Sequence, residues 1–152
     1  MDTTIALANH QDRNVLVALL AAQLHEHHIA LSSERLAAAV DGPLRDAARG
    51  LFLVARAQGI AVGVAYLSFT WTLEHGGKSC WLEELYVMPA YRERGIGRQL
   101  LDAVCQRATE LGCAAVDLEV EEEHARAQHL YEREGFRPHR RHRWVRTLRD
   151  DH

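Results

Sequence analysis

An apolar strand that ends in a glycine-containing turn and leads into a long amphipathic helix constrains this chain more than any other feature. The strand ends with residues 85–89, Leu-Tyr-Val-Met-Pro, and residues 92–98 read Arg-Glu-Arg-Gly-Ile-Gly-Arg. Glycines at a strand-to-helix turn leave backbone N–H groups unhindered, and the start of the helix adds positive dipole character. The segment therefore predicts a binding site for a phosphate or pyrophosphate group.

The glycine spacing differs from those of the familiar nucleotide loops. A Walker loop needs Gly-x-x-x-x-Gly-Lys-Ser/Thr, and the dinucleotide fingerprint needs a third glycine in register, which is absent after Gly97. Taken alone, two glycines at the start of a helix are equally compatible with an ordinary tight turn. The spacing therefore leaves the bound group open.

The apolar pattern predicts alternating strands and helices in an α/β domain. Strands are expected over residues 3–8, 51–55, 61–67, 80–88, 114–121 and 143–148. Helices are expected from Asn9 or Asp12 through Leu24, from residues 32–33 to Val40, and over residues 95–111 and 123–134, with a short helical piece running to about Arg49. Gly42-Pro43 is expected to end the second helix, Gly112 to cap the third, and Gln58-Gly59 to form a hairpin turn. Since the pattern shows no repeat and no linker, residues 1–152 are predicted to form one domain with a mixed sheet.

Composition excludes several classes of partner. The formal charge of −3 argues against nucleic acid as the main partner, because contacts to phosphates drive such binding. Cys80, Cys105 and Cys113 are odd in number and form no Cys-x-x-Cys pair, which is typical of free thiols in a reducing compartment. The sequence has no run long enough for a membrane span and no basic-then-apolar signal at its start. We therefore expect a cytoplasmic protein without a membrane or nucleic-acid partner.

Two segments resemble the signatures of the GNAT superfamily of N-acetyltransferases. Residues 82–101, which contain Leu-Glu-Glu-Leu-Tyr-Val-Met-Pro and the glycine turn, resemble its acetyl-CoA-binding motif. Residues 127–136, which end in Tyr-Glu-Arg-Glu-Gly-Phe, resemble its second signature, and both are most similar to the spermidine/spermine N-acetyltransferase type and its bacterial relatives. The resemblance is sharp over residues 80–136. It implies a mixed α+β fold with a central, mostly antiparallel, twisted sheet and helices on both faces.

The resemblance implies that acetyl-CoA is the co-substrate. The main chain of Leu85, Tyr86 and Val87 is expected to pair with pantetheine, and the Val87 N–H is also a candidate donor to the oxyanion. The remaining cofactor-binding candidates are Arg92, Arg94, Gly95, Ile96, Gly97, Arg98 and His124. For the arginine side chains a solvated helix face is the alternative. His124 stands where many relatives have Asn, and its imidazole can donate one hydrogen bond.

Acyl transfer to an amine needs a proton donor for the departing thiolate and a group that deprotonates the amine. By position in the resemblance, Tyr131 is the expected general acid, because a phenol with a pKa of about 10 stays protonated at neutral pH; packing of the helix is the alternative. Glu83 is the preferred base or amine anchor and Glu84 the second choice, with a salt-bridged carboxylate as the alternative. Adjacent strand residues point to opposite faces unless a bulge intervenes.

The segment His25-Glu26-His27-His28 lacks the His-Glu-x-x-His spacing of a zinc helix, so no metal site is expected. By its place in the family it ends the first helix and lines the acceptor mouth. Glu26 and His27 are therefore substrate-binding candidates. Trp71, just before the Gly76-Gly77 turn, is a candidate for the same mouth, and ordinary packing is its alternative. Cys80 has no recognisable histidine base beside it, which favours direct transfer over an acylated enzyme.

Together these features predict an N-acetyltransferase that moves the acetyl group of acetyl-CoA directly to a primary amine of a small molecule such as a polyamine. A protein lysine or N-terminal acetyltransferase and a non-catalytic acyl-CoA-binding regulatory module are the alternatives. Because the family is commonly dimeric, a homodimer is also one expectation.

Overall fold

The structure is a computed structural model that describes residues 2–121 and 124–149. The chain divides into two compact units, Met1–Leu118 and Glu119–His152, and each is described by itself. The expectation of one domain over residues 1–152 therefore stays a prediction. Among the described residues, no helix is long and apolar enough to span a membrane.

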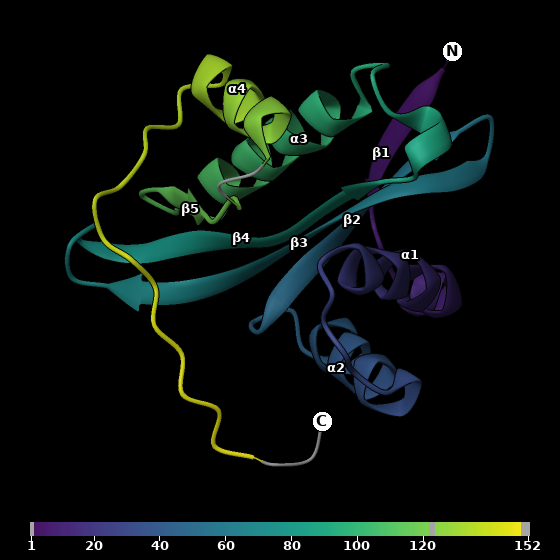
Figure 1. Cartoon of the computed structure of the whole chain (residues 1–152), viewed down its shortest axis with the longest axis horizontal. Coiled ribbons are helices and arrows are strands. Elements are labelled where there is room, and N and C mark those ends of the chain that lie inside the picture. Colours follow the sequence, from purple (N-terminus) through teal and green to yellow (C-terminus); the bar gives the residue numbers. More distant parts are fainter. Residues whose placement is uncertain (1, 122–123, 150–152) are drawn as a thin grey trace. The chain divides into compact units, whose positions relative to one another are not determined.

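The first unit contains a sheet, three α-helices and two short 3₁₀ helices. Its elements are β1 (Thr3–Leu7), η1 (His10–Asp12), α1 (Arg13–Glu26), α2 (Ser33–Arg45), β2 (Gly50–Ala57), β3 (Ile60–Thr72), β4 (Gly77–Val87), η2 (Pro89–Tyr91), α3 (Ile96–Glu110) and β5 (Val116–Leu118). The described part of the second unit contains α4 (Ala125–Arg133) (Figure 1).

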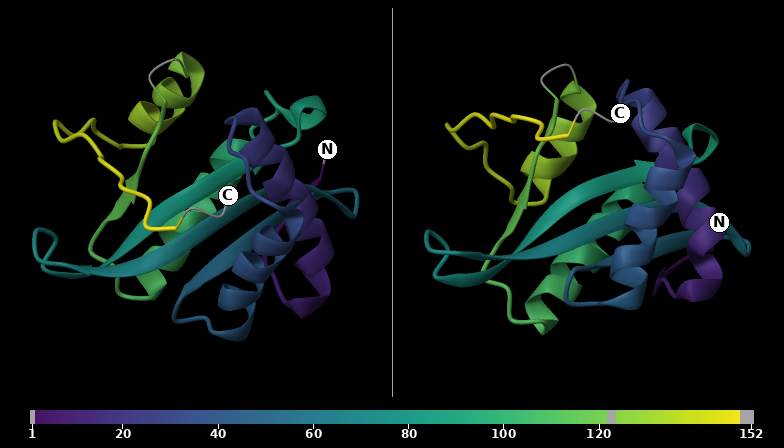
Figure 2. Two further views of the ribbon diagram at one scale, coloured as in Figure 1. Left: turned by 60° about the horizontal axis from the view of Figure 1, so that its bottom comes forward. Right: turned by 90° about the horizontal axis from the view of Figure 1, so that it is seen from below.

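The sheet has the order β1-β2-β3-β4-β5, with β1 to β4 antiparallel and β5 parallel to β4. Helices α1 and α2 cover one face of the twisted sheet and α3 covers the other (Figures 1 and 2). This arrangement confirms the mixed, mostly antiparallel sheet with helices on both faces. In its one described parallel pair, β4 and β5, the helix α3 provides the crossover connection that parallel pairing requires.

The core on the α1/α2 side follows the helical spacing of the sequence. Leu16, Leu19 and Leu20 of α1 are buried and pack with Leu36 and Val40 of α2. The strand residues that complete this cluster are Phe52, Val54, Val64 and Tyr86. Alternate residues of the same strands point to α3, so the sheet is buried on both faces, with β4 held between β3 and β5.

Helix boundaries agree with the capping signals except at one point. Asn9 forms a capping box with Asp12, and the Ser32 hydroxyl accepts from the Arg35 N–H at 3.2 Å. The prediction that Gly42-Pro43 ends the second helix, with a separate helical piece to about Arg49, is wrong. Helix α2 runs unbroken to Arg45 because Pro43 is buried in its packed face, where packing outweighs the missing backbone donor.

Two expected strands differ from the structure. The strand predicted over residues 114–121 is limited to Val116–Leu118, which pair only with Cys80–Leu82. The strand predicted over residues 143–148 does not form, since the described part of the second unit offers no other strand to pair with it. Trp144 is therefore 92% exposed.

The Gln58-Gly59 hairpin is confirmed, with φ of 52° and 80° at its two central residues. Helix α4 begins at Ala125, and Glu123, its predicted first residue, lies outside the described residues.

Candidate active site

A β-bulge in β4 determines where the two adjacent carboxylates point. Leu82 pairs with Leu67 of β3, but Glu84 pairs with Tyr66, so Glu83 is the extra residue of β4. Residues directly opposite each other in a ladder share a face of the sheet. The bulge therefore leaves Leu82 on the face of Leu67 and turns Glu84 to the opposite face with Tyr66. The bulge thus interrupts the alternation that would otherwise direct Glu83 and Glu84 to opposite faces of the sheet.

Glu84 is held from α1. The side-chain N–H₂ group of Gln23 donates to Glu84 Oε2 at 3.0 Å and to the carbonyl oxygen of Leu85 at 3.4 Å. Burial raises the pKa of Glu84, while the Gln23 hydrogen bond and the charge of His27 lower it and the charge of Glu83 raises it. The net direction is upward. Glu84 is therefore a carboxylate whose ionisation depends on its neighbours.

Tyr66 lies opposite Glu84 and adds a hydroxyl to the same face. Its ring stacks on Phe52 with ring centroids 4.7 Å apart. Burial, helped by the charge of Glu83, raises the pKa of Tyr66 to about 12. The hydroxyl therefore stays protonated at neutral pH and is a fixed hydrogen-bond donor or acceptor. Glu83 itself, at the bulge, is exposed.

The pairing of β5 stops where the bulge begins. The last parallel pair is Leu82 with Leu118, whereas β4 continues to Val87. Among the described residues of the first unit, no strand pairs with this side of β4 beyond Leu82. Five residues of β4, Glu83 to Val87, thus present an open edge.

The alternation of hydrogen-bonded pairs between β3 and β4 determines which backbone groups the open edge presents. The Met88 N–H donates to the Val62 carbonyl at 2.8 Å, and hydrogen-bonded pairs alternate along an antiparallel ladder. The main chain of Tyr86 is therefore directed at β3, and the N–H groups of Leu85 and Val87 point away from it. Of the three residues predicted to pair with pantetheine through the main chain, the structure leaves Leu85 and Val87 in position to do so. Tyr86 is not in position to do so, because its backbone N–H and C=O groups are directed at β3 within the sheet.

The loop from Arg92 to the start of α3 has the geometry expected of an anion site. Gly95 is the N-cap residue in the left-handed conformation, with φ 82°, and Glu93 also has a left-handed φ of 66°. Gly95 offers no side-chain cap, and helix geometry leaves the first N–H groups of α3, those of residues 96–98, without intrahelical acceptors. A Cβ added at Gly95 would meet nothing within 4 Å. The loop therefore presents an accessible helix N-terminus to a ligand.

The arginines of this loop are not equivalent. Arg92 Nε donates to the carbonyl oxygen of Val87 at 2.8 Å, and its Nη2 donates to Glu26 at 2.7 Å. Its guanidinium also lies 5.5 Å from the centre of the Tyr86 ring. Arg94 and Arg98 are exposed. Arg92 thus ties the end of α1 to the end of β4, and its charge is shared with Glu26.

The acceptor-side candidates are only partly gathered. Glu26 and His27 lie at the end of α1, and the charge of His27 lowers the pKa of Glu84. Trp71 is 77% exposed and pairs with Lys78, five residues beyond Tyr66 along β3. At about 3.3 Å per residue this places it roughly 16 Å from the bulge. The structure therefore does not bring Trp71 to the carboxylate pair.

In the second unit, the motif that carries Tyr131 is a helix cap. Gly135 has φ 90°, and the Phe136 N–H donates to the Tyr131 carbonyl at 2.9 Å. The two rings meet edge to face with centroids 5.8 Å apart. This is the backbone and apolar pairing of a Schellman cap. The Tyr-x-x-x-Gly-Phe spacing is thus required by the end of α4, whatever the hydroxyl does.

Tyr131 and His124 stand at opposite ends of α4. Burial raises the pKa of Tyr131, so its hydroxyl stays protonated at neutral pH. His124 is the N-cap residue, and its Nε2 lies 3.5 Å from a carboxylate oxygen of Glu121. Their roles as general acid and cofactor contact stay predictions.

Two residues of the site were not foreseen. Gln23 falls on the buried face of α1, one turn after Leu19 and Leu20, where a polar residue needs a partner. That mismatch with the apolar periodicity is a usable signal. Tyr66 lies in a predicted apolar strand, and nothing in the chain before folding distinguishes it from a packing aromatic.

The thiol of Cys80 is buried in the core. Cys80 is 1% exposed, and burial raises the pKa of its thiol to about 12, so it is a poor nucleophile.

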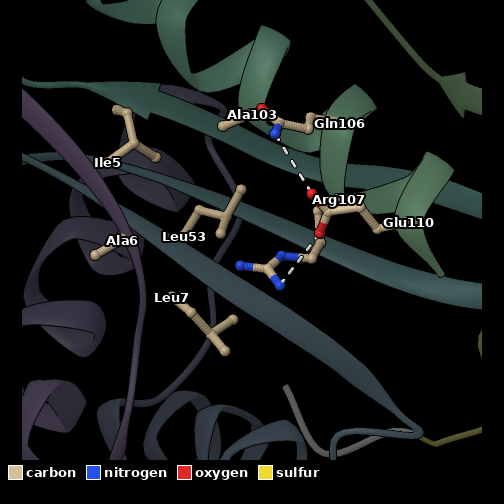
Figure 3. A pocket seen from close by; sticks show the side chains of 8 residues that line it. All are labelled: Ile5, Ala6, Leu7, Leu53, Ala103, Gln106, Arg107 and Glu110. Atoms are coloured by element: carbon tan, nitrogen blue, oxygen red, sulfur yellow. Dashed lines mark hydrogen bonds and ion pairs between the residues drawn. The ribbon is translucent and has the colours of Figure 1, made fainter.

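A cavity of about 150 Å³ lies at the other edge of the sheet, between β1 and α3 (Figure 3). Its lining residues are Ile5, Ala6, Leu7, Leu53, Ala103, Gln106, Arg107 and Glu110. Arg107 pairs there with Glu110 at 3.6 Å, and no acid–base group outside this pair lines it. Across the described ranges, no group of three or more His, Cys, Asp or Glu side chains is arranged to hold a metal.

One family model covers all three parts of this site: the open edge of β4, its bulge and the N-terminus of α3. Residues 15–136 match the model of the Acetyltransferase (GNAT) family. The chain belongs to this family. Both signatures of the GNAT fold noted in the sequence, residues 82–101 and 127–136, fall within the matched range.

Individual GNAT relatives cover only part of this chain. It is 35% identical over 77 residues to thialysine N-epsilon-acetyltransferase of Bos taurus, which covers 50% of this chain and 43% of that protein. It is 31% identical over 86 residues to aminoglycoside N(6')-acetyltransferase type 1 of Salmonella typhimurium, covering 55% and 59%. The matches thus span less than two thirds of these relatives. A solved structure of an aminoglycoside N-acetyltransferase in complex with CoA has a TM-score of 0.82 at 24% identity, over 97% of this chain and 95% of that one, which shows the shared fold.

Proposed function

We propose that this chain is an N-acetyltransferase that moves the acetyl group of acetyl-CoA directly to a primary amine of a small molecule. The observation that carries the proposal is the open edge of β4, which lies between a carboxylate pair at its bulge and the N-terminus of α3. An edge of N–H donors that leads to a positive helix end suits an extended molecule with amide groups and a pyrophosphate.

The residues present fit acetyl-CoA, which would supply the acetyl group as a reactive thioester. The N–H groups of residues 95–98 would hold its pyrophosphate, and the absence of a side chain at Gly95 keeps that approach open. The side chains of Arg94 and Arg98 add positive charge, whereas Arg92 acts from its bond to Val87. Ile96 is buried, so it would contribute only its main chain.

The acid and base roles follow from the protonation states. At pH 7 roughly 99.9% of an alkyl amine is protonated, so a carboxylate must accept its proton directly or through water. Glu83 is the proposed acceptor of that proton because it is exposed at the bulge. The Val87 N–H would stabilise the negative charge that develops on the acyl oxygen. Tyr131 would donate a proton to the departing thiolate, and His124 would contact the co-substrate.

The acceptor is proposed to be a polyamine or another small molecule rich in amino groups. Glu83 and Glu84 add two carboxylates at one end of the open edge, and such a pair favours a cation over an amino acid, whose carboxylate it would repel. Glu26 contributes less than the sequence suggested, because it is paired with Arg92. The relatives named for thialysine and aminoglycosides also take small amines.

Glu83→Gln tests both the base and the acceptor class. The variant should lower kcat/KM for amines most at low pH, where the deprotonated amine is scarcest, and leave acetyl-CoA affinity unchanged. The measurement is free CoA release against pH with polyamines, aminoglycosides and amino acids as acceptors. An unchanged pH profile in the variant would remove Glu83 as the base. Preference for anionic acceptors would contradict the proposed class.

We also propose a cytoplasmic homodimer. The support for the compartment is that Cys80, Cys105 and Cys113 are all thiols. The support for self-association is the strand-like sequence at residues 143–148, whose Trp144, Val145 and Leu148 are exposed in the single chain. Light scattering after gel filtration should give twice the monomer mass, and a monomer at micromolar concentration would contradict the dimer.

A further inference from the structure

We propose that Gln23 is a positioning residue that keeps the Glu84 carboxylate ionised and fixed at the bulge, so that Glu84 serves beside Glu83 as a second anionic contact for the acceptor. The part that concerns the acceptor rests on the proposed function. The part that concerns Gln23 and Glu84 rests on the geometry of the free protein.

The position of Gln23 argues for a specific purpose. It continues the buried face of α1 formed by Leu16, Leu19 and Leu20, and it is only 7% exposed. An apolar side chain of similar size would fill this place without the cost of burying an amide. Instead, the amide donates to Glu84 at 3.0 Å and to the Leu85 carbonyl at 3.4 Å. It thereby couples α1 to the two residues that follow the bulge.

In the hydrogen bond between Gln23 and Glu84 the amide is the donor and the carboxylate the acceptor, and this direction affects the ionisation of Glu84. Glu84 faces a half-buried environment, which by itself favours the neutral acid. A donor aimed at a carboxylate oxygen stabilises the ionised form. The bond also fixes Oε2 on the α1 side.

The other groups around Glu84 do not replace this bond. From the end of α1, His27 favours the ionised form only while its ring is protonated, and Glu26 is paired with Arg92. From β4, Glu83 opposes ionisation, and the hydroxyl of Tyr66 on β3 is neutral. Tyr86 on β4 is also neutral at ordinary pH, because burial raises its pKa. Gln23 therefore supplies the contribution that does not change with pH.

The test replaces Gln23 by Met, which keeps the length of the side chain and removes both donors. Glu84 should then ionise at higher pH, so the acidic limb of kcat/KM for a diamine should move to higher pH. Well below the midpoint of that limb KM for the diamine should rise about tenfold, as expected for a change of one unit in the pKa. Affinity for acetyl-CoA should stay unchanged. Asn14→Leu, which removes an exposed amide from the same helix, is the matched control and should behave as wild type.

Two further measurements separate positioning from packing. In a Glu84→Gln background, Gln23→Met should cause no further shift of the pH profile, because the group it acts on is gone. NMR titration of the Glu84 carboxyl in the free protein should give a higher pKa in Gln23→Met than in wild type. That titration needs no turnover, so it decides the inference even if no amine is acetylated, an outcome that would overturn only the proposed function. An unchanged Glu84 titration, or an equal effect of Gln23→Met with and without Glu84, would overturn the inference.

Discussion

At the scale of single residues, adjacent side chains of the same type acquire different chemistry from one backbone irregularity. Glu83 and Glu84 are neighbours in the chain, but the bulge exposes Glu83 and directs Glu84 at Tyr66 and α1. The sequence identifies both carboxylates, because they interrupt an apolar strand and match a family motif. It does not reveal Gln23, which lies 61 residues from Glu84 and meets it only in the folded chain.

Tyr131→Phe tests the proposed general acid at this scale. The variant keeps the ring that packs on Phe136, so folding should survive, while kcat should fall by roughly 10²–10⁴ with unchanged acetyl-CoA affinity. Because burial raises the pKa of Tyr131, the wild-type activity should not decline from loss of this proton until the pH exceeds the ordinary tyrosine value of about 10. Steady-state kinetics with Tyr91→Phe as control provide the measurement. A fall of less than about threefold would leave Tyr131 as a packing residue.

At the scale of elements, the prediction from sequence succeeded where local signals and packing agree. The caps at Asn9, Ser32 and Gly112 mark real helix boundaries. It failed where packing overrides a local signal, as at Pro43 in α2, and where a strand depends on a distant partner. Residues 143–148 have the composition of a strand, but β structure requires a neighbour, and the described residues of their unit contain none.

Gly97→Val tests the helix N-terminus as the phosphate site. A branched side chain in the first turn of α3 would intrude where backbone N–H groups meet the pyrophosphate, so acetyl-CoA affinity should fall at least tenfold in a folded protein. Calorimetric titration measures the affinity, and circular dichroism checks folding. Gln99→Val places the same side chain on an exposed position of the same helix and should bind normally. Equal affinities in the two variants would end the assignment of this loop.

Gly50, at the start of β2, and Gly42, inside α2, give a matched pair of glycine substitutions. A Cβ at Gly50 would lie 2.6 Å from the Leu67 carbonyl oxygen and 2.8 Å from the Tyr66 ring, so Gly50→Ala should destabilise the fold by about 1–3 kcal/mol. A Cβ at Gly42 in α2 meets only Arg49, at 3.7 Å, so Gly42→Ala should stabilise by about 0.5–1 kcal/mol. Urea denaturation measures both. A Gly50→Ala variant as stable as the wild type would mean that the packing around Tyr66 is looser than described.

At the scale of the whole molecule, the half-buried charge of Glu84 lowers the stability of the fold at neutral pH. Burial raises the folded-state pKa of Glu84 above its value in the unfolded chain, where the ordinary value is 4.5. A raised carboxyl pKa means that the folded state favours the proton more than the unfolded state does. The contribution of Glu84 to stability is therefore greatest below pH 4.5 and is lost as the pH rises through the folded-state pKa.

Glu84→Gln should accordingly raise Tm by a few degrees at pH 7, because it removes a half-buried negative charge and still accepts from Gln23. The gain should shrink as the pH falls below 4.5, where the wild-type carboxyl is protonated in both states. Calorimetric melting at pH 4 and pH 7 measures the difference. Glu83→Gln, at an exposed position, should leave Tm nearly unchanged at both values. A lower Tm for Glu84→Gln at pH 7 would contradict the burial argument.

The central claim is that the open edge of β4 and its carboxylate pair serve direct acetyl transfer to a small amine. The most direct measurement incubates the protein with acetyl-CoA and spermidine and quantifies free CoA and acetylated amine by mass spectrometry, with Gly97→Val in parallel. We expect one acetylated amine for each CoA released, intersecting initial-velocity lines when both substrates are varied, and loss of both products in the variant at limiting acetyl-CoA. Failure of the wild-type protein to form any acetylated amine from polyamines, aminoglycosides or amino acids, although it binds acetyl-CoA, would contradict the account.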